Sequence, residues 1–221
     1  AERFGEIKTQ EQVQGLQRRI APHLLRRVKE DVAKDIPPKE ETIIDVELTS
    51  AQKQYYRAIF ERNHGFLLQS TKGALPKLMN IQMELRKCCN HPFLIAGVEE
   101  KEVDELESKQ ENVASTREQR VKELVIPSSG KMVLLNKLLP KLREEGHKVL
   151  IFSQMVRMIE IIEEYADALG YPCEKLTGQV KGNERQKSID RFNKDKDSFL
   201  FLLSTRAGGV GINLTAADTC I

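Results

Sequence analysis

The second half of the chain alternates short strand-like segments with longer stretches in which apolar residues recur every three or four positions. The strand-like segments are 149–152 (VLIF), 173–176 (CEKL) and 199–203 (FLFLL). The last of these is apolar at every position, which is typical of a strand that helices cover on both faces. The helical spacing before and between the segments predicts crossover helices. This order predicts an α/β fold, in which helices flank a parallel sheet with right-handed crossovers.

Polar residues follow each predicted strand, and the carboxyl ends of strands are where open α/β sheets bind ligands. These residues are Ser153 and Gln154, Thr177 and Gly178, and Ser204, Thr205 and Arg206. Because the carboxyl ends of parallel strands meet at one edge, we expect the three tips to line a single rim. Hydroxyl, amide and guanidinium groups along one rim suit a phosphate backbone.

Glycines follow the last of these tips, at Gly208, Gly209 and Gly211, with Asn213 close behind. One interpretation is a tight turn from strand to helix that needs glycine for its backbone angles. The other is a loop whose bare backbone approaches a bulky anion and points N–H groups at it. A buried strand that leads directly into Ser-Thr-Arg and three glycines favours the second interpretation.

The first half of the chain is predicted to be mainly helical. Residues 1–47 are basic and interrupted by prolines, and the β-branched segment 42–48 (TIIDVEL) predicts a strand. Thr49 and Gln52 have the spacing of a capping box, so a helix should start there and run to about Asn63. A second helix should follow from about residue 76, with one buried face formed by Leu78, Ile81, Leu85 and Cys88 or Cys89.

Two clusters in this half have the residue types of a metal site, and neither is assigned one. Cys88 and Cys89 lie next to each other before His91, and adjacent cysteines do not easily chelate one tetrahedral zinc. Residues 99–123 are dominated by Glu, Lys, Gln and Arg, which predicts a solvated linker or an exposed helix. Within them, 104–107 (DELE) is similar to the acidic box that holds magnesium in many ATPases, but no apolar strand precedes it.

The composition limits the functions that these patterns allow. The 221 residues include 35 Lys plus Arg against 33 Asp plus Glu, so nucleic-acid binding requires local basic clusters such as 18–19 and 26–27. The absence of Trp argues against a surface that stacks single-stranded bases. Four cysteines, two of them adjacent, do not form a secreted disulfide framework, and no apolar run reaches membrane-spanning length. We therefore expect a soluble protein of a reducing compartment, with no membrane partner.

Five strings closely resemble the SWI/SNF-type ATPases, which remodel chromatin. They are PHLLRRVKEDVAKDIPPKEETIIDVELT, MELRKCCNHPFLI, SGKMVLLNKLLPKL, VLIFSQMVRM and LLSTRAGGVGINLTAAD. Within that family, KEETIIDVELT and INLTAADTCI are most similar to the large, chromodomain-containing subgroup of the chromodomain-helicase-DNA-binding (CHD) branch. The resemblance covers nearly the whole chain and is weakest between Glu99 and Val125. It implies a RecA-like helicase C-terminal lobe, incomplete in this sequence, preceded by a mainly helical family-specific segment.

The resemblance also implies roles for the strand tips, because VLIFSQM is similar to helicase motif IV, LTGQVKGNERQ to the next motif and STRAGGVGIN to motif V. It implies contacts with the DNA backbone by Ser153, Gln154, Gly178, Arg185, Ser204, Thr205 and Arg206. It also implies that three residues face the nucleotide in the cleft between two motor lobes, namely Gly209, Gly211 and Asn213. Lys131, in the string SGK, is a weaker candidate. Thr177 stands where the family usually has Asp, so it is assigned no role.

By the same resemblance the chain divides into four segments. These are the end of the first motor lobe with its brace and connecting strand (1–47), a family-specific helical protrusion (48–98), a charged linker (99–127) and the C-terminal lobe (128–221). The implied cofactors are ATP and Mg²⁺, with the Mg²⁺ ligands in the absent first lobe. The implied partners are double-stranded DNA, nucleosomes and the first motor lobe of the same protein, in the nucleus.

We therefore expect part of an ATP-dependent chromatin remodeller that translocates on double-stranded DNA and repositions nucleosomes. The sequence contains no Gly-x-x-x-x-Gly-Lys-Ser/Thr loop. It also stops before the motif whose arginine finger would contribute a factor of about 10³–10⁵ in turnover. The chain alone is accordingly predicted not to hydrolyse ATP. Two alternatives stay open: an RNA helicase lobe of the same superfamily, and a non-catalytic scaffold.

Overall fold

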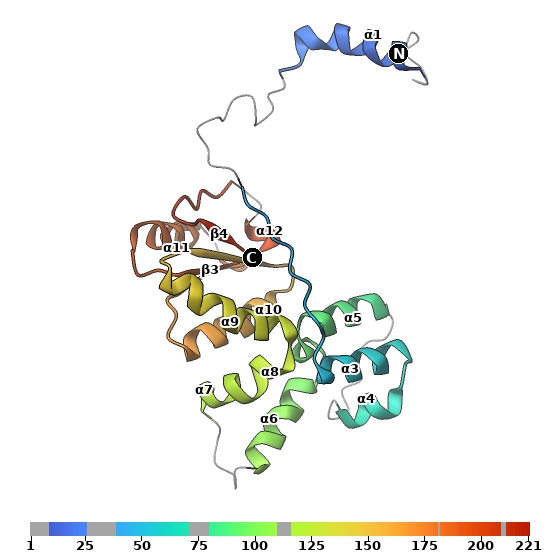
Figure 1. Cartoon of the computed structure of the whole chain (residues 1–221), viewed down its shortest axis with the longest axis vertical. Helices are drawn as coiled ribbons and strands as arrows, with labels where there is room; N and C mark the ends of the chain where they lie inside the picture. Colours follow the sequence, from blue (N-terminus) through green and yellow to red (C-terminus); the bar gives the residue numbers. More distant parts are fainter. Residues whose placement is uncertain (1–8, 26–38, 71–79, 110–115, 181, 209–210) are drawn as a thin grey trace. The chain divides into compact units, whose positions relative to one another are not determined.

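The computed structural model of the chain describes residues 9–25, 39–70, 80–109, 116–180, 182–208 and 211–221 (Figure 1). The chain consists of two compact units, Ala1–Ile44 and Asp45–Ile221. In the first unit, α1 (Gln10–Ile20) begins with a capping box formed by Thr9 and Gln12. The 3-10 turn η1 (Ala21–His23) follows it.

The structure corrects the predicted strand at 42–48, which has no regular secondary structure. Its β-branched side chains favour an extended backbone, but a strand forms only where a neighbouring strand pairs with it. None of the described strands pairs with this segment. Ile43 and Ile44 accordingly remain exposed.

The second unit begins with helices, as predicted. They are α3 (Ser50–Phe60), α4 (His64–Ser70) and α5 (Ile81–Asn90), followed by the 3-10 turn η3 (Pro92–Leu94). The capping box that starts α3 is confirmed, since Thr49 accepts from the N–H of Gln52 and the Gln52 side chain accepts from the N–H of Thr49. Cys88 is the fully buried cysteine of the predicted apolar face of α5, whereas Leu78 lies outside the described residues. Helix α4 was not expected from the pattern.

Of the solvated linker and the exposed helix predicted for 99–123, the described part is helical, but the structure corrects its exposure, because several of its residues are packed in the core. It forms α6 (Val98–Lys109), α7 (Arg117–Arg120), the π-helix η4 (Val121–Val125) and α8 (Ile126–Ser128). Leu106, Val121 and Val125 are buried in the main core. Apolar residues that are sparse among many charges still suffice for a buried face when they recur at helical spacing. The boundaries proposed for the four segments stay a prediction.

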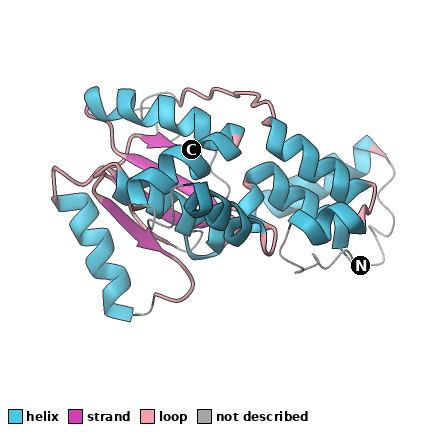
Figure 2. Ribbon diagram, turned by 90° about the horizontal axis from the view of Figure 1, so that it is seen from below, coloured by secondary structure: helices cyan, strands magenta, loops and turns pink. Residues whose placement is uncertain are grey.

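The rest of the second unit is the predicted parallel sheet. Its strands are β1 (Val149–Ser153), β2 (Cys173–Leu176), β3 (Leu200–Ser204) and β4 (Thr219–Cys220), hydrogen-bonded in the order β2-β3-β1-β4. Every pair is parallel. The helices are α9 (Gly130–Glu144), α10 (Val156–Ala168), α11 (Gly182–Lys194) and the short α12 (Thr205–Gly208). Figure 2 shows the strands with helices around them.

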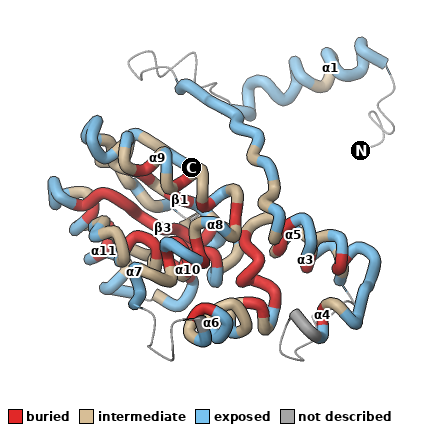
Figure 3. Tube along the Cα trace, turned by 60° about the horizontal axis from the view of Figure 1, so that its bottom comes forward, coloured by how far each residue is buried: buried red, intermediate tan, exposed pale blue. Residues whose placement is uncertain are grey.

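Strand β3 forms the centre of the lobe, and all five of its residues are buried (Figure 3). Leu200 and Leu202 belong to the large core that includes α9 and α10. Phe201 and Leu203 belong to a second core with Ile189 of α11. Because successive side chains of a strand point to opposite faces, this division confirms that helices cover both sides of the sheet. No helix in the described part of the chain is long and apolar enough to cross a membrane.

Candidate nucleic-acid interface

The carboxyl ends of three strands meet at one edge of the sheet. In the register of the sheet Ser153 of β1 lies opposite Ser204 of β3, and Leu176 of β2 lies opposite Leu203. The residues that follow the strands line an open pocket of about 700 Å³ at this edge. Its lining consists of Met83, Arg86, Gln154, Met155, Val156, Gly178, Ser204, Thr205 and Arg206. All three predicted tips therefore contribute to one cavity.

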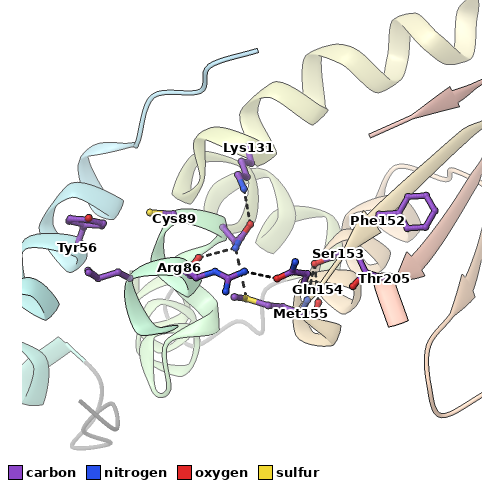
Figure 4. Close-up of a pocket in the computed structure, with 11 residues that line it drawn as sticks. Tyr56, Arg86, Cys89, Lys131, Phe152, Ser153, Gln154, Met155 and Thr205 are labelled. Atoms are coloured by element: carbon purple, nitrogen blue, oxygen red, sulfur yellow. Dashed lines mark hydrogen bonds between the residues drawn. The ribbon is translucent and has the colours of Figure 1, made fainter. Parts of the chain in front are cut away.

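A second pocket, of about 600 Å³, adjoins the first and lies between α5, the start of α9 and the tip of β1 (Figure 4). Both pockets are lined by Arg86, Gln154, Met155 and Thr205. The second is completed by Tyr56, Leu85, Cys89, Asn90, Lys131, Phe152 and Ser153. We refer to the two pockets together as the rim groove.

The described lining of the rim groove contains cations and no carboxylate. Its charged side chains are Arg86, Lys131 and Arg206, all exposed. Arg206 has no ion-pair or hydrogen-bond partner among the described residues. A surface lined by charges of one sign attracts ions of the other sign. The rim groove therefore suits a polyanion.

Hydrogen bonds connect α5 to the tip of β1 across this groove. The guanidinium of Arg86 donates to the side-chain oxygen of Gln154. The ammonium of Lys131 donates to Oδ1 of Asn90 over 2.7 Å, and the amide nitrogen of Asn90 lies 3.9 Å from the sulfur of Met155. Figure 4 shows the side chains of Arg86, Lys131, Gln154 and Met155 between the helices and the strand end.

The two predicted serines turn their hydroxyls toward the protein backbone. Ser153 Oγ accepts from the N–H of Met155 over 3.1 Å, which fixes the turn after β1. Ser204 is buried, and its Oγ accepts from the N–H of Ala207 over 3.3 Å. These hydroxyls hold the turns, whereas Thr205 and Arg206 are exposed toward the groove.

Arg185, also predicted at the DNA backbone, does not line the described groove. Its guanidinium donates to the carbonyl oxygen of Ala207 over 2.8 Å. It therefore supports α12, the short helix that carries Thr205 and Arg206. A guanidinium has five N–H donors, so this bond leaves others for further partners.

Of the three residues predicted to face the nucleotide, the two that the structure describes do not line the rim groove. Gly209 lies outside the described residues. Gly211 has φ 55°, a left-handed backbone that glycine adopts without strain, which supports the tight-turn interpretation at this position. Asn213 is exposed, and its carbonyl oxygen accepts from Asn193 of α11 over 3.1 Å. Neither Gly211 nor Asn213 lines either pocket.

The cysteines and the histidine around 88–91 have structural partners. The Cys88 thiol donates to the carbonyl oxygen of Gln52, and burial raises its pKa to about 12. His91 is fully buried, Nδ1 accepts from the N–H of Phe93, and Nε2 therefore donates to the carbonyl oxygen of Val125 over 2.9 Å. Burial lowers the pKa of His91 to about 4. No three His, Cys, Asp or Glu side chains in the described segments are grouped to hold a metal ion.

Sequence reasoning missed the contribution of α5. Arg86, Cys89 and Asn90 line the groove although their segment was predicted only to bury one apolar face. A signal was present, because Arg86 follows Leu85 of the apolar face and precedes buried Cys88. That spacing places the arginine on the opposite, exposed side of the helix. The sequence alone does not show which surface this side faces.

Solved structures share this architecture and define its class. One described as the C-terminal part of the Fun30 ATPase domain is 26% identical, with a TM-score of 0.58 over 83% of this chain and 74% of that one. Another, a Sulfolobus solfataricus SWI2/SNF2 ATPase core in complex with dsDNA, is 24% identical, with a TM-score of 0.58 over 94% of this chain and 40% of that one. The fold is thus that of the C-terminal lobe of SWI2/SNF2 ATPases.

Sequence comparisons place the chain more narrowly. Residues 3–94 match the SNF2-related domain, and residues 130–221 match the helicase conserved C-terminal domain. Chromodomain-helicase-DNA-binding protein 7 of Homo sapiens is 57% identical over 99% of this chain. The chain belongs to the SNF2-related ATPases and, within them, to the chromodomain-helicase-DNA-binding branch. It spans 7% of the length of that human relative.

Proposed function

We propose that this chain is part of an ATP-dependent chromatin remodeller, in which the lobe grips the backbone of double-stranded DNA at the rim groove. The observation that carries the proposal is the lining of the groove, where Arg86 of α5, Lys131 of α9 and Arg206 after β3 present cations without a carboxylate. The relatives support the choice of ligand, since their names include both helicase and DNA-binding.

In this proposal the lobe reads no bases. Gln154, Gly178, Thr205 and Arg206 contact phosphate and sugar groups, which position a protein on DNA without sequence information. Ser153, Ser204 and Arg185 take part by holding the turns from which those groups project. Such contacts suit a motor that must move along any sequence and reposition nucleosomes.

ATP hydrolysis is assigned to the full-length protein. Closure of two motor lobes around ATP would shift the grip of this lobe along one DNA strand. Gly209, Gly211 and Asn213 stay our candidates for the side that faces the nucleotide, and the ligands of Mg²⁺ are assigned to the first lobe. The proposed location is the nucleus, where duplex DNA and nucleosomes are found.

The test is ATP hydrolysis by the full-length protein with duplex DNA, with RNA of the same length and without nucleic acid. We expect duplex DNA to raise turnover well above both other conditions. Greater stimulation by RNA would support the helicase alternative, and no hydrolysis in any condition would support the scaffold alternative. Duplex DNA without any effect on turnover would refute the proposal.

A further inference from the structure

One buried amide joins three helices next to the rim groove. Gln52 lies in the first turn of α3 and is 1% exposed. Its Oε1 accepts from the N–H of Thr49 and from the N–H of Gly130, each over 3.1 Å. Its Nε2 donates to the carbonyl oxygens of Cys88, over 2.8 Å, and Cys89, over 3.3 Å. The amide therefore connects the starts of α3 and α9 with the end of α5.

The end of α5 is held mainly by side chains from other elements. A helix leaves its last four carbonyl groups without partners inside the helix. Here the carbonyl of Lys87 accepts from the N–H of His91, and the Gln52 side chain donates to the carbonyls of Cys88 and Cys89. The hydroxyl of Ser129 donates to the carbonyl of Asn90 over 2.7 Å. Three of the four carbonyls thus accept from side chains outside α5.

The same helix end carries one wall of the rim groove. Arg86 lies one turn before it and donates to Gln154. Asn90, the last residue of α5, accepts from Lys131. A shift of this helix end would move the cations of α5 and of the start of α9 relative to the strand tips.

We propose that Gln52 is a positioning residue for the rim groove, which holds Arg86 and Lys131 at a fixed spacing opposite the strand tips. Gln52 itself contacts no ligand. The inference rests on the proposed function, because the groove must bind the DNA backbone for the spacing to matter.

The test is Gln52→Glu in the full-length protein. The carboxylate keeps the shape of the side chain and still accepts from Thr49 and Gly130. It cannot donate to Cys88 and Cys89, and it places a negative charge against two carbonyl oxygens. Gln54→Glu is the matched control, because it makes the same charge change at an exposed position of the same helix.

Two measurements separate positioning from general stability, both at a temperature where circular dichroism shows each variant folded. Hydrogen exchange without DNA should become faster in Gln52→Glu across 85–91 and remain unchanged in Gln54→Glu. The affinity for a duplex should fall at least about fivefold. The slope of log affinity against log salt should flatten by up to about two units, because that slope counts phosphate contacts and not the folded fraction.

Failure of this inference differs from failure of the proposed function. If the wild-type protein does not bind duplex DNA, the proposed function fails. If it binds, and Gln52→Glu keeps the wild-type slope, the positioning role alone is refuted. If Gln52→Glu does not fold, Ser129→Ala decides, since it removes one contact of the same helix end. It should flatten the slope in the same direction, and an unchanged slope would overturn the inference.

Discussion

Single side chains at the strand ends divide between two tasks. Ser153 and Ser204, together with Arg185 of α11, form hydrogen bonds with the backbone of the turns that follow β1 and β3. Thr205 and Arg206 project from the turn that these bonds support, and both are exposed. Because Arg206 has no partner among the described residues, a phosphate can form a charge-assisted hydrogen bond with it without breaking an existing one.

Arg206→Ala should therefore weaken DNA binding about equally on all sequences and flatten the salt slope by about one unit. Arg143→Ala is the matched control, since Arg143 lines a separate pocket with Lys148, which immediately precedes β1. The measurement is affinity for two unrelated duplexes across a salt series. An unchanged slope, or a loss confined to one sequence, would contradict a phosphate contact.

His91 makes the stability of the fold depend on pH. Its pKa is lowered from 6.5 to about 4 by burial, so the unfolded chain binds the proton more readily. Stability is then fully present above about pH 6.5 and is lost as pH falls toward 4. Between pH 7 and 5 the loss should be about 2 kcal/mol.

Urea unfolding at both pH values measures this loss, and His91→Gln provides the comparison because it removes the titration. The variant should be less stable at pH 7 but should lose less stability at pH 5 than the wild type. Equal losses in the two proteins would show that other groups cause the pH dependence.

At the scale of elements, the close packing of α9 against the segment before α3 depends on a glycine. A Cβ on Gly130 would lie 2.2 Å from the carbonyl oxygen of Glu47 and 2.9 Å from Cγ1 of Val46. The backbone atom cannot move aside as a flexible side chain would. The same glycine donates its N–H to the side-chain oxygen of Gln52, so this residue contributes both to the close packing and to the hydrogen bonds of Gln52.

Gly130→Ala should destabilise the protein by about 1–3 kcal/mol, as overpacking commonly does. Gly65→Ala in α4 is the control, because its Cβ would meet only Asn63 Oδ1, at an ordinary distance of 3.6 Å. Denaturant midpoints of both variants provide the comparison. A Gly130 variant as stable as the Gly65 variant would contradict the close approach.

For the whole molecule, the near balance of 35 basic against 33 acidic residues gives a formal net charge of only +2. Binding of a polyanion therefore cannot follow from overall charge and requires charges to be sorted in space. Elsewhere in the second unit opposite charges pair, as Glu99 does with both Arg120 and Arg157. In the rim groove the described cations meet no carboxylate. Stimulation of ATP hydrolysis by duplex DNA in the full-length protein tests whether these cations act in DNA binding.

The sequence by itself determined the elements whose signals are local. The capping box at Thr49, the apolar run of β3 and the helical spacing around Ile189 and Phe192 each depend on neighbours along the chain. The parallel order of strands then follows from the alternation of helix and strand, and with it the shared edge of the three tips. The family was evident from strings of residues at those same positions.

Only the tertiary structure decided what lies across from the tips. That Arg86 meets Gln154, and that Gln52 connects three helices, depends on contacts between residues 36 to 78 positions apart. Periodicity shows which side of a helix is apolar, but it does not show which surface faces the polar side. The same reason explains why the strand predicted at 42–48 does not form and why the helices within 99–127 are packed. Pairing and burial are made by partners that are distant in the sequence.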